Sequence, residues 1–434
     1  MTDRQNVEIN SSLASTQTCD PIKMEERSGY KKTKLGWLPK EWEVVKLKDI
    51  SGSFSGGTPS KSKPEFYGGN IHWIKSGELN QGMITNTSEF ISELGLLSSS
   101  AKIIKPETLL IAMYGATAGV VAISKIEGAI NQAVLALILS KKTELHFMYN
   151  YLKMRMPKIV QSLVQGGQPN LSGGIINKLN IVLPPLPEQQ KIATILSTWD
   201  SAIAKQEQLI TAKQEFKKGL MQLLLTGKKR FEGFEGEWES KTLNECCSVK
   251  GKYGINAAAV PYKTELPRYL RITDIDDSGN YSPDKEVSVD DPTWSEYVLE
   301  DGDIVFARTG NTTGKTYLYD SADGELVFAG FLIKFKPDPR KLNPYFLKYF
   351  TNSTAYWKWI EVMSVRSGQP GINSNEYGKL NIKLPSLTEQ QKIASVLSAA
   401  DKEIGLLQSE LATLRGQKRG LMQRLLTGEV RVEI

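Results

Sequence analysis

The stretch PEQQKIATILSTWD, residues 187–200, returns much later in the chain as TEQQKIASVLSAAD, residues 388–401. Glu389 of the second copy lies 201 positions beyond Glu188 of the first, and the likeness continues until KKGLMQLLLTG and KRGLMQRLLTG close the two copies. Upstream, the same spacing relates GGQPNLSGGIINKLNIVLP to SGQPGINSNEYGKLNIKLP. A repeat of this length indicates duplicated domains rather than a solenoid, whose units run about 20–50 residues.

The repeat divides the chain into five predicted parts. Each copy consists of a divergent block and a conserved segment, and the blocks share only loose openings such as KEWEVVKL and GEWESKTL. The N-terminal tail is polar and has no hydrophobic periodicity, so we expect it to be flexible. The parts are the tail (residues 1–33), the first block (34–187), a central helix (188–229), the second block (230–387) and a C-terminal helix (388–434).

Both conserved segments predict long helices with a coiled-coil seam. Apolar residues recur at steps of four and three, the spacing by which two helices bury a shared stripe. Polar Gln206, Lys213 and Lys217 enter the first seam and Lys418 the second; such residues cost stability but fix register. The simplest way to bury both stripes is an antiparallel pair with an internal pseudo-two-fold axis. The apolar seam residues are Ile192, Leu196, Trp199, Ile203, Ile210, Leu220 and Leu224, and Ile393, Leu397, Ala400, Ile404, Leu407, Leu411, Leu414, Leu421 and Leu425.

The ends of both helices carry recognisable signals. Thr388 with Gln391 predicts a capping box at the start of the second helix, and Pro187 takes the equivalent place in the first, where proline is tolerated. Gly227 and Gly428 follow the last apolar turns, as glycines at helix C-termini do. A rise of 1.5 Å per residue makes each helix a rod of about 55–60 Å.

Composition is that of an ordinary globular chain. The 434 residues are 40% hydrophobic and carry a net charge of +6, which permits an anionic partner without demanding one. Three cysteines without a C-x-x-C pair and only two histidines indicate a reducing compartment and argue against bound metal. No signal peptide is evident, and the most apolar run, residues 109–123, is too short to cross a bilayer. We therefore expect a cytoplasmic protein with no membrane partner.

The divergent blocks predict a mixed α/β fold. Short β-branched runs such as LNIVLP and DIVFA read as strands, and dense glycine, proline and asparagine punctuation separates them. A helical stretch within residues 342–360 is expected to cover the sheet of the second block.

Three stretches resemble catalytic motifs, and each fails. TGNTTGKT has three residues between Gly310 and Gly314, where a phosphate-binding loop needs four. DPTW, from Asp291, lacks the second proline of an adenine-methyltransferase loop, and Pro283–Asp284 is followed by no Asp/Glu-x-Lys pair of a nuclease. With two histidines in the chain, general-base chemistry is poorly supplied. No catalytic residue is predicted.

Two similar frames with different surface residues suit a duplex with two half-sites, which lie about 34–36 Å apart at one helical turn. The first block carries 16 Lys and Arg against 10 Asp and Glu, the second 19 against 23, so a DNA face on the second must be a local patch. The matched GQP turns also fit a purely structural role, and exposed polar loop residues are the alternative throughout. Candidate contacts to phosphates or base edges are Lys61, Lys63, Lys75, Tyr114, Gln168, Asn170, Arg271, Arg308, Asn311, Lys315, Arg366 and Gln369.

The twice-written phrase EQQKIAx(I/V)LSxxDxxI, closed by K(K/R)GLMQxLLTG, resembles the specificity subunit of type I restriction–modification systems. GGTPSKSKPEFYGGNIHWIKSGEL in the first block and the weaker YLRITDID in the second also resemble that family, so the likeness extends from about Lys34 onward. The resemblance implies that each block is a target-recognition domain for one half of a split double-stranded DNA site. It implies that the helices set the gap between the halves.

The resemblance also implies partners. Two modification subunits would carry the S-adenosylmethionine chemistry on adenine, and separate restriction subunits would use ATP and Mg²⁺, while this chain would be non-catalytic, bind no cofactor and work at the nucleoid. The second block departs from the first, because GKYGINAAAVPY, residues 251–262, replaces the GGTPS loop. DNA contacts therefore do not transfer from one block to the other.

Three alternatives stay open on the sequence. The chain could serve a fused restriction–methylation enzyme instead of a multi-subunit one. The net-acidic second block would also suit a coiled-coil scaffold whose heads bind proteins. An enzyme that uses TGNTTGKT would require ATP binding by the isolated chain.

Overall fold

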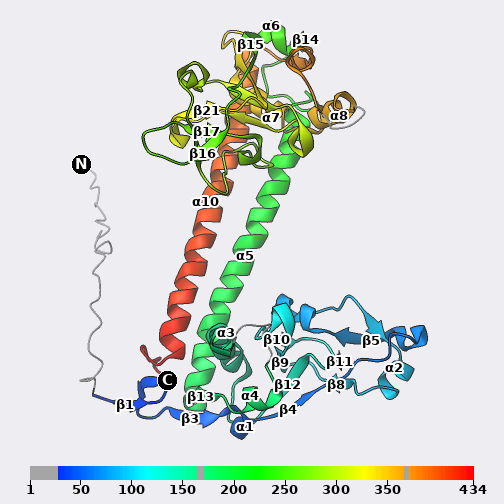
Figure 1. The fold of residues 1–434 in the computed structure, drawn as a ribbon, viewed down its shortest axis with the longest axis vertical. Helices are drawn as coiled ribbons and strands as arrows, with labels where there is room; N and C mark the ends of the chain where they lie inside the picture. Colours follow the sequence, from blue (N-terminus) through cyan, green and yellow to red (C-terminus); the bar gives the residue numbers. More distant parts are fainter. Residues whose placement is uncertain (1–27, 164–170, 366–370) are drawn as a thin grey trace, which may run out of the picture. The chain divides into compact units, whose positions relative to one another are not determined.

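The computed structural model describes residues 28–163, 171–365 and 371–434, which form two compact units (Figure 1). The first unit combines Met1–Ile203 with Thr413–Ile434, and the second is the continuous stretch Ala204–Ala412. Each unit therefore contains one divergent block together with parts of both long helices.

The first unit is built around two sheets. Most strand pairs are antiparallel, and each sheet has one parallel pair: Met83–Ile84 with Val121–Ser124 in the larger sheet, and Tyr67–Ile74 with Gly128–Ile130 in the smaller. The larger sheet has the order β4 (Ser51–Ser55), β12 (Val134–Leu139), β9 (Thr108–Ala112), β10 (Val121–Ser124) and β6 (Met83–Ile84). The smaller has the order β7 (Phe90–Ile91), β5 (Tyr67–Ile74), β11 (Gly128–Ile130) and β8 (Lys102–Ile104).

Shorter elements complete the first unit. Strand β1 (Tyr30–Thr33), which lies in the stretch that we assigned to the N-terminal tail, pairs with β2 (Gly36–Pro39). Strand β3 (Glu43–Lys46) pairs with β13 (Asn180–Leu183). The helices of the block are α1 (Leu47–Ile50), α2 (Glu93–Leu97), α3 (Leu145–Leu163) and α4 (Gly173–Asn177).

The second unit repeats this plan. Its central sheet has the order β15 (Cys247–Tyr253), β22 (Leu332–Pro337), β19 (Ile304–Ala307) and β20 (Thr316–Leu318). A second sheet has the order β16 (Ala259–Pro261), β18 (Val287–Val289), β17 (Arg268–Leu270) and β21 (Leu326–Phe328). Strand β14 (Glu239–Thr242) pairs with β23 (Asn381–Leu384), and the helices are α6 (Leu243–Cys246), α7 (Pro344–Phe350), α8 (Thr354–Met363) and α9 (Ser374–Gly378). The predicted mixed α/β blocks are confirmed.

Two long helices follow the blocks: α5 (Leu186–Leu224) and α10 (Leu387–Leu426). The expected capping box at Thr388 and Gln391 is wrong, because α10 begins earlier and the Ser386 hydroxyl accepts from the Glu389 backbone N–H. Serine can cap the start of a helix in this way, so the first turn forms one residue before threonine. Gly227 and Gly428 have φ of 69° and 72°, the left-handed conformation that ends helices.

Each hydrophobic core includes one end of each long helix. In the first unit, Leu425 and Leu426 near the end of α10 join the core that contains Trp42 and Ile192. In the second, Leu224 and Leu225 join the core that contains Ile393 and Leu397. Burial of a leucine is worth about 1.5–3 kcal/mol, so these helix ends contribute substantially to each unit.

Polar contacts join α5 to α10 inside each unit. In the second unit, Gln206 donates to the Leu407 carbonyl at 3.1 Å, and Lys213 pairs with Glu403 at 2.6 Å. The Lys217 ammonium donates to Asp401 in the same unit, and Lys418 pairs with Asp200 in the first. Within the described residues, no helix is long and apolar enough to span a membrane.

Candidate nucleic-acid interface

The predicted DNA contacts of the first block lie in loops and at strand ends. Lys61 and Lys63 are exposed, and the Lys63 ammonium lies 5.2 Å from the ring centre of Phe66. Lys75 pairs with Glu89 and lies over Trp73, which leaves it less available to a phosphate than the other two lysines. Gln168 and Asn170 lie outside the described residues.

Two predicted contacts of the second block are committed to internal ion pairs. The Arg271 guanidinium donates twice to Asp274, at 2.7 and 2.9 Å, and these hydrogen bonds raise the pKa of Arg271. Lys315 lies 2.7 Å from Asp277 and donates to the Ile275 carbonyl, and its hydrogen bond lowers the pKa of Asp277. Both cations therefore have partners in the loop that follows β17, and their contact with DNA stays a prediction.

One turn has the same backbone geometry in both units. At the end of β9, the Ala112 N–H donates to the Val120 carbonyl; at the end of β19, the Ala307 N–H donates to the Lys315 carbonyl. A short 3₁₀ turn follows in each, at Gly115–Thr117 and Gly310–Thr312. This turn carries the predicted contact Tyr114, which is 38% exposed, in the first unit.

The repeat places Met113 and Arg308 at the same position of this turn. The N–H of Met113 donates to Ala133 and that of Arg308 to Phe331, while their carbonyls accept from Leu171 and Ile372 respectively. Leu171 and Ile372 follow the GQP stretches in the sequence, and they are the residues that bond to this turn in each unit. The predicted contact Asn311 is exposed beside Arg308, whereas Arg366 and Gln369 lie outside the described residues.

The Arg308 side chain stacks on an aromatic residue that sequence reasoning missed. Its guanidinium carbon lies 4.9 Å from the ring centre of Tyr253, at the end of β15. The Tyr253 hydroxyl accepts from the Ser374 N–H at 3.1 Å, and the Ser374 hydroxyl donates to the Gly251 carbonyl at 3.0 Å, which fixes the ring. Tyr253 is 39% exposed and Phe331 56% exposed, so aromatic surface borders the arginine. The motif GKYG offered the signal, but only the strand pairing brings Tyr253 to Arg308.

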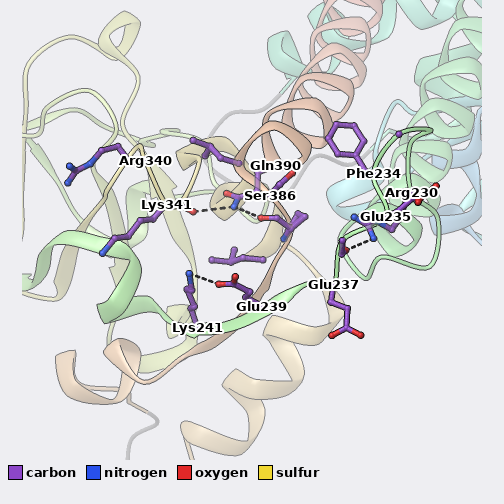
Figure 2. Close-up of a pocket in the computed structure, with 15 residues that line it drawn as sticks. Arg230, Phe234, Glu235, Glu237, Glu239, Lys241, Arg340, Lys341, Ser386 and Gln390 are labelled. Atoms are coloured by element: carbon purple, nitrogen blue, oxygen red, sulfur yellow. Dashed lines mark hydrogen bonds and ion pairs between the residues drawn. The ribbon is translucent and has the colours of Figure 1, made fainter.

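A polar pocket of about 420 Å³ lies beside the start of α10 in the second unit (Figure 2). Its basic residues already have partners: Arg230 bonds Glu389, and Lys241 pairs with Glu239. Arg340 pairs with Asp338, and Lys341 donates to the Glu245 carbonyl. Since each cation is engaged within the protein, the pocket presents no preformed phosphate site.

The stretch TGNTTGKT has the wrong geometry for a nucleotide loop. It forms the 3₁₀ turn at Gly310–Thr312 between β19 and β20, and no helix follows whose N-terminus could face a phosphate. Its lysine, Lys315, is bonded to Asp277. In the described part of the chain, no group of three or more His, Cys, Asp or Glu could hold a metal ion.

The predicted seam residues are all buried or half-buried, whereas many of the helix positions between them are exposed. The polar residues Gln206, Lys213, Lys217 and Lys418 are half-buried along the same stripe. This distribution is what a helix that buries one face produces.

The repeated Glu-Gln pair forms a network that sequence reasoning did not foresee. Glu188 is fully buried and accepts two hydrogen bonds from Arg431, at 2.6 and 2.9 Å, and one from Trp42. At the matching place, Glu389 accepts two from Arg230, at 2.9 and 2.6 Å. The exact repetition of EQQ was the available signal, but it does not reveal the arginine partners.

The glutamines of this motif also act alike. The Gln189 side chain accepts from the Glu144 N–H and donates to the carbonyls of Lys142 and Pro184. The Gln390 side chain accepts from the Asn343 N–H and donates to the carbonyls of Lys341 and Pro385. Both glutamines therefore fasten the start of a long helix to the block that precedes it.

The fold and the site together define a tandem protein: two α/β blocks of one design, each followed by a long helix, with different side chains on a shared turn. A family model described as the type I restriction modification DNA specificity domain matches residues 39–212 and again residues 235–415. The chain belongs to this family, and the duplication and the resemblance expected from its sequence are confirmed.

Curated relatives agree with this family. The type I restriction enzyme MjaVIII specificity subunit of Methanocaldococcus jannaschii is 26% identical over 420 residues, covering 91% of this chain and 94% of the relative. The EcoKI specificity subunit of Escherichia coli is 22% identical over 422 residues, covering 91% and 90%.

Solved structures show the same fold at low identity. A chain from a structure of type I R-M complex assembly and conformational transition matches with a TM-score of 0.59 and 18% identity, covering 91% of this chain and 99% of that one. The type I S subunit from M. genitalium matches with a TM-score of 0.53 and 16% identity, covering 91% and 96%.

Proposed function

We propose that this chain is the DNA sequence-specificity subunit of a type I restriction–modification complex and that it reads an asymmetric, bipartite duplex site. One observation carries the proposal: the family's DNA specificity domain occurs twice. The shared turn presents different chemistry in each copy, with Met113 in the first and Arg308 in the second. Two copies with the same residues there would suit a symmetric site, so the difference favours unlike half-sites.

The two long helices form the spacer as an antiparallel coiled coil with a pseudo-two-fold axis. In support, Gln206 of α5 bonds to Leu407 of α10, whereas Lys217, later in α5, bonds to Asp401, which comes earlier in α10. This reversed order is that of an antiparallel pair. The offset of 201 residues turns the Lys217–Asp401 pair into Lys418–Asp200, and turns Arg230–Glu389 into Arg431–Glu188. Both repeated pairs are what an internal two-fold relation predicts.

The chemistry belongs to partner subunits. We propose that two modification subunits supply S-adenosylmethionine-dependent methylation of adenine and that restriction subunits use ATP and Mg²⁺, while this chain is non-catalytic and binds none of these cofactors. It would work in the cytoplasm at the nucleoid. The failed catalytic motifs of the sequence are in keeping with this division of labour.

The test uses the complex with its modification subunits, purified and titrated with duplexes over a salt series. Modified-base sequencing of the host genome first supplies the site. We expect binding to that site at least 10³-fold tighter than to a scrambled duplex at physiological salt. Equal affinity for both, with a steep salt dependence, would indicate phosphate binding alone and reject the proposal. A protein-binding scaffold would then be the better account, with its support in the net-acidic second block.

A further inference from the structure

The arginines of the second unit differ in how they are used. Arg230 bonds Glu389, Arg268 lies 3.4 Å from Glu286, Arg271 bonds Asp274 and Arg340 bonds Asp338. Arg308 pairs with none of the carboxylates that the structure describes, and its recorded side-chain contact is the stack on Tyr253. Among the described arginines of this unit, it is therefore the one whose hydrogen-bonding groups are left for a ligand.

The stack also orients the Arg308 guanidinium. An arginine on an aromatic face keeps its plane parallel or inclined to the ring while its N–H edge points outward. Since the Tyr253 hydroxyl is held by Ser374 at 3.1 Å, the platform itself has a fixed position. A guanidinium held in this way loses less freedom when it forms two parallel hydrogen bonds.

The same position in the first unit shows that the frame does not need the arginine. Met113 takes the place of Arg308 and is buried, at 3% exposure. Ser55, opposite Leu135, takes the place of Tyr253, opposite Ile333. The charged group and its aromatic platform are thus present together in one unit and absent together at the matching positions of the other, which points to a role in recognition rather than in folding.

The surroundings favour a base edge over a phosphate. The neighbouring Lys315 is engaged by Asp277, and the Arg308 N–H is already donated to Phe331. Phosphate sites usually gather several cations and backbone N–H groups, whereas here a single guanidinium lies over the exposed ring of Tyr253. In the major groove, two parallel arginine N–H groups match the O6 and N7 acceptors of guanine.

We propose that Arg308, stacked on Tyr253, reads a guanine in the half-site bound by the second block, and that the first block lacks this contact. The inference rests on the proposed function, since it needs a DNA-reading complex. It assigns Arg308 as a specificity-determining residue and Tyr253 as its positioning residue.

The experiment compares the wild-type complex with complexes that carry Arg308→Met, Arg308→Lys or Arg424→Ala. Modified-base sequencing of each host genome gives the methylated motif. Arg308→Met copies the residue that the first block accepts at this position, so the fold should persist. We expect one G·C position in one half-site to become degenerate, with discrimination reduced about ten- to hundred-fold, while the other half-site and the spacer stay unchanged. Arg308→Lys, which keeps the charge but not the paired donors, should relax the same position partly.

Arg424 lies at the far end of α10 and is 58% exposed in its side chain, so Arg424→Ala should leave the motif intact. An unchanged motif in Arg308→Met would overturn the inference. So would uniformly weaker binding to all duplexes with a salt slope reduced by about one, which marks a phosphate contact. The inference would also fail if the only half-site with a G·C pair in the wild-type motif kept that pair in Arg308→Met. If the wild-type complex shows no motif at all, the proposed function itself fails. Should Arg308→Met not assemble, Arg308→Lys decides by the same criteria.

Discussion

At the scale of single residues, the two buried glutamates of the repeated motif tie distant parts of each unit together. Glu188 has a fully buried side chain, and its partner Arg431 is held in turn by Glu41 at 2.9 Å. The hydrogen bonds that Arg431 donates raise its pKa, and those to Glu188 are the largest cause. A buried carboxylate that loses its arginine keeps the cost of desolvation without the compensating bonds.

We therefore predict that Arg431→Ala and Arg230→Ala each lower the free energy of unfolding, because each leaves a buried carboxylate without its cation. Arg230→Ala should destabilise more than Arg431→Ala. Glu188 keeps its hydrogen bond from Trp42 when Arg431 is lost, whereas Trp238, the tryptophan that corresponds to Trp42, donates to no described residue and so leaves Glu389 without such a bond. Urea denaturation followed by fluorescence would measure both. The control Arg424→Ala removes an exposed arginine and should change stability by less than about 0.5 kcal/mol. If all three variants have the free energy of unfolding of the wild type, the arginine–glutamate pairs do not stabilise the units.

The adjacent cysteines yield a second prediction at this scale. Cys246 and Cys247 are buried and unpaired, and burial raises the pKa of Cys247 to about 12. Because the thiolate is the reactive form, both should resist an aromatic disulfide reagent at pH 8 in the native state and react fully in denaturant. A Cys19→Ser background isolates the pair. Rapid reaction of the native protein would contradict the burial of these side chains.

The candidate site shows which residue roles a sequence can reveal. Arg308, Asn311 and Tyr114 were predicted as contacts from residue type and loop position, and their role stays a prediction. The ion pair of Arg271 and the contact of Arg308 with Tyr253 were not predicted. Asp274 meets Arg271 through local capping, and Tyr253 meets Arg308 through strand pairing. A side chain's availability depends on its partners, and those are a tertiary property.

At the scale of elements, the long helices were the most predictable part of the fold. Their seam residues were read from the spacing of apolar residues, and the glycines past each end have the expected positive φ. The start of α10 was misplaced because several residues near Ser386 can cap a helix, and only the hydrogen bond distinguishes them. The parallel pairing of β10 with β6 was not predictable, since the short strand Met83–Ile84 carries little pattern of its own.

Gly416 within α10 and Gly428 just past its end give opposite predictions. Gly416 lies within the helix, and an added Cβ would meet nothing within 4 Å, so Gly416→Ala should stabilise by about 0.5–1 kcal/mol. Gly428 has φ of 72°, and an added Cβ would lie 2.6 Å from Pro39, so Gly428→Ala should destabilise. Thermal melts should therefore shift in opposite directions. Equal shifts would mean that the end of α10 is not packed as described.

At the scale of the whole molecule, the sequence indicates where the repeated segments lie but not which segment completes which core. The heptad pattern is equally compatible with helix ends that stand alone. The placement of Leu425 and Leu426 with Trp42 depends on the complementary surface of the first block, which no local pattern encodes. For the same reason, the compact units differ from a simple division of the chain into consecutive parts.

The proposed spacer gives the prediction at this scale. Duplicating residues 206–212 adds one heptad to α5 and about 10 Å of helix, close to the rise of three base pairs. We expect the unread gap of the methylated motif to lengthen while both half-sites keep their bases. Modified-base sequencing of the strain that carries the variant would show this. An altered half-site, or an unchanged gap in a methylating complex, would contradict the role of α5 as a spacer.

The division of the chain into units has a consequence for its synthesis. The second unit is one continuous stretch, Ala204–Ala412, whereas the first needs Thr413–Ile434. The block that is synthesised first therefore has Glu188 without Arg431, and its core without Leu425 and Leu426, until the residues of Thr413–Ile434 have been made. Every residue of the later block precedes the segment that completes the first, so the first block cannot finish folding before the second has been synthesised, and a product that stops at Ala412 would leave its leading half incomplete.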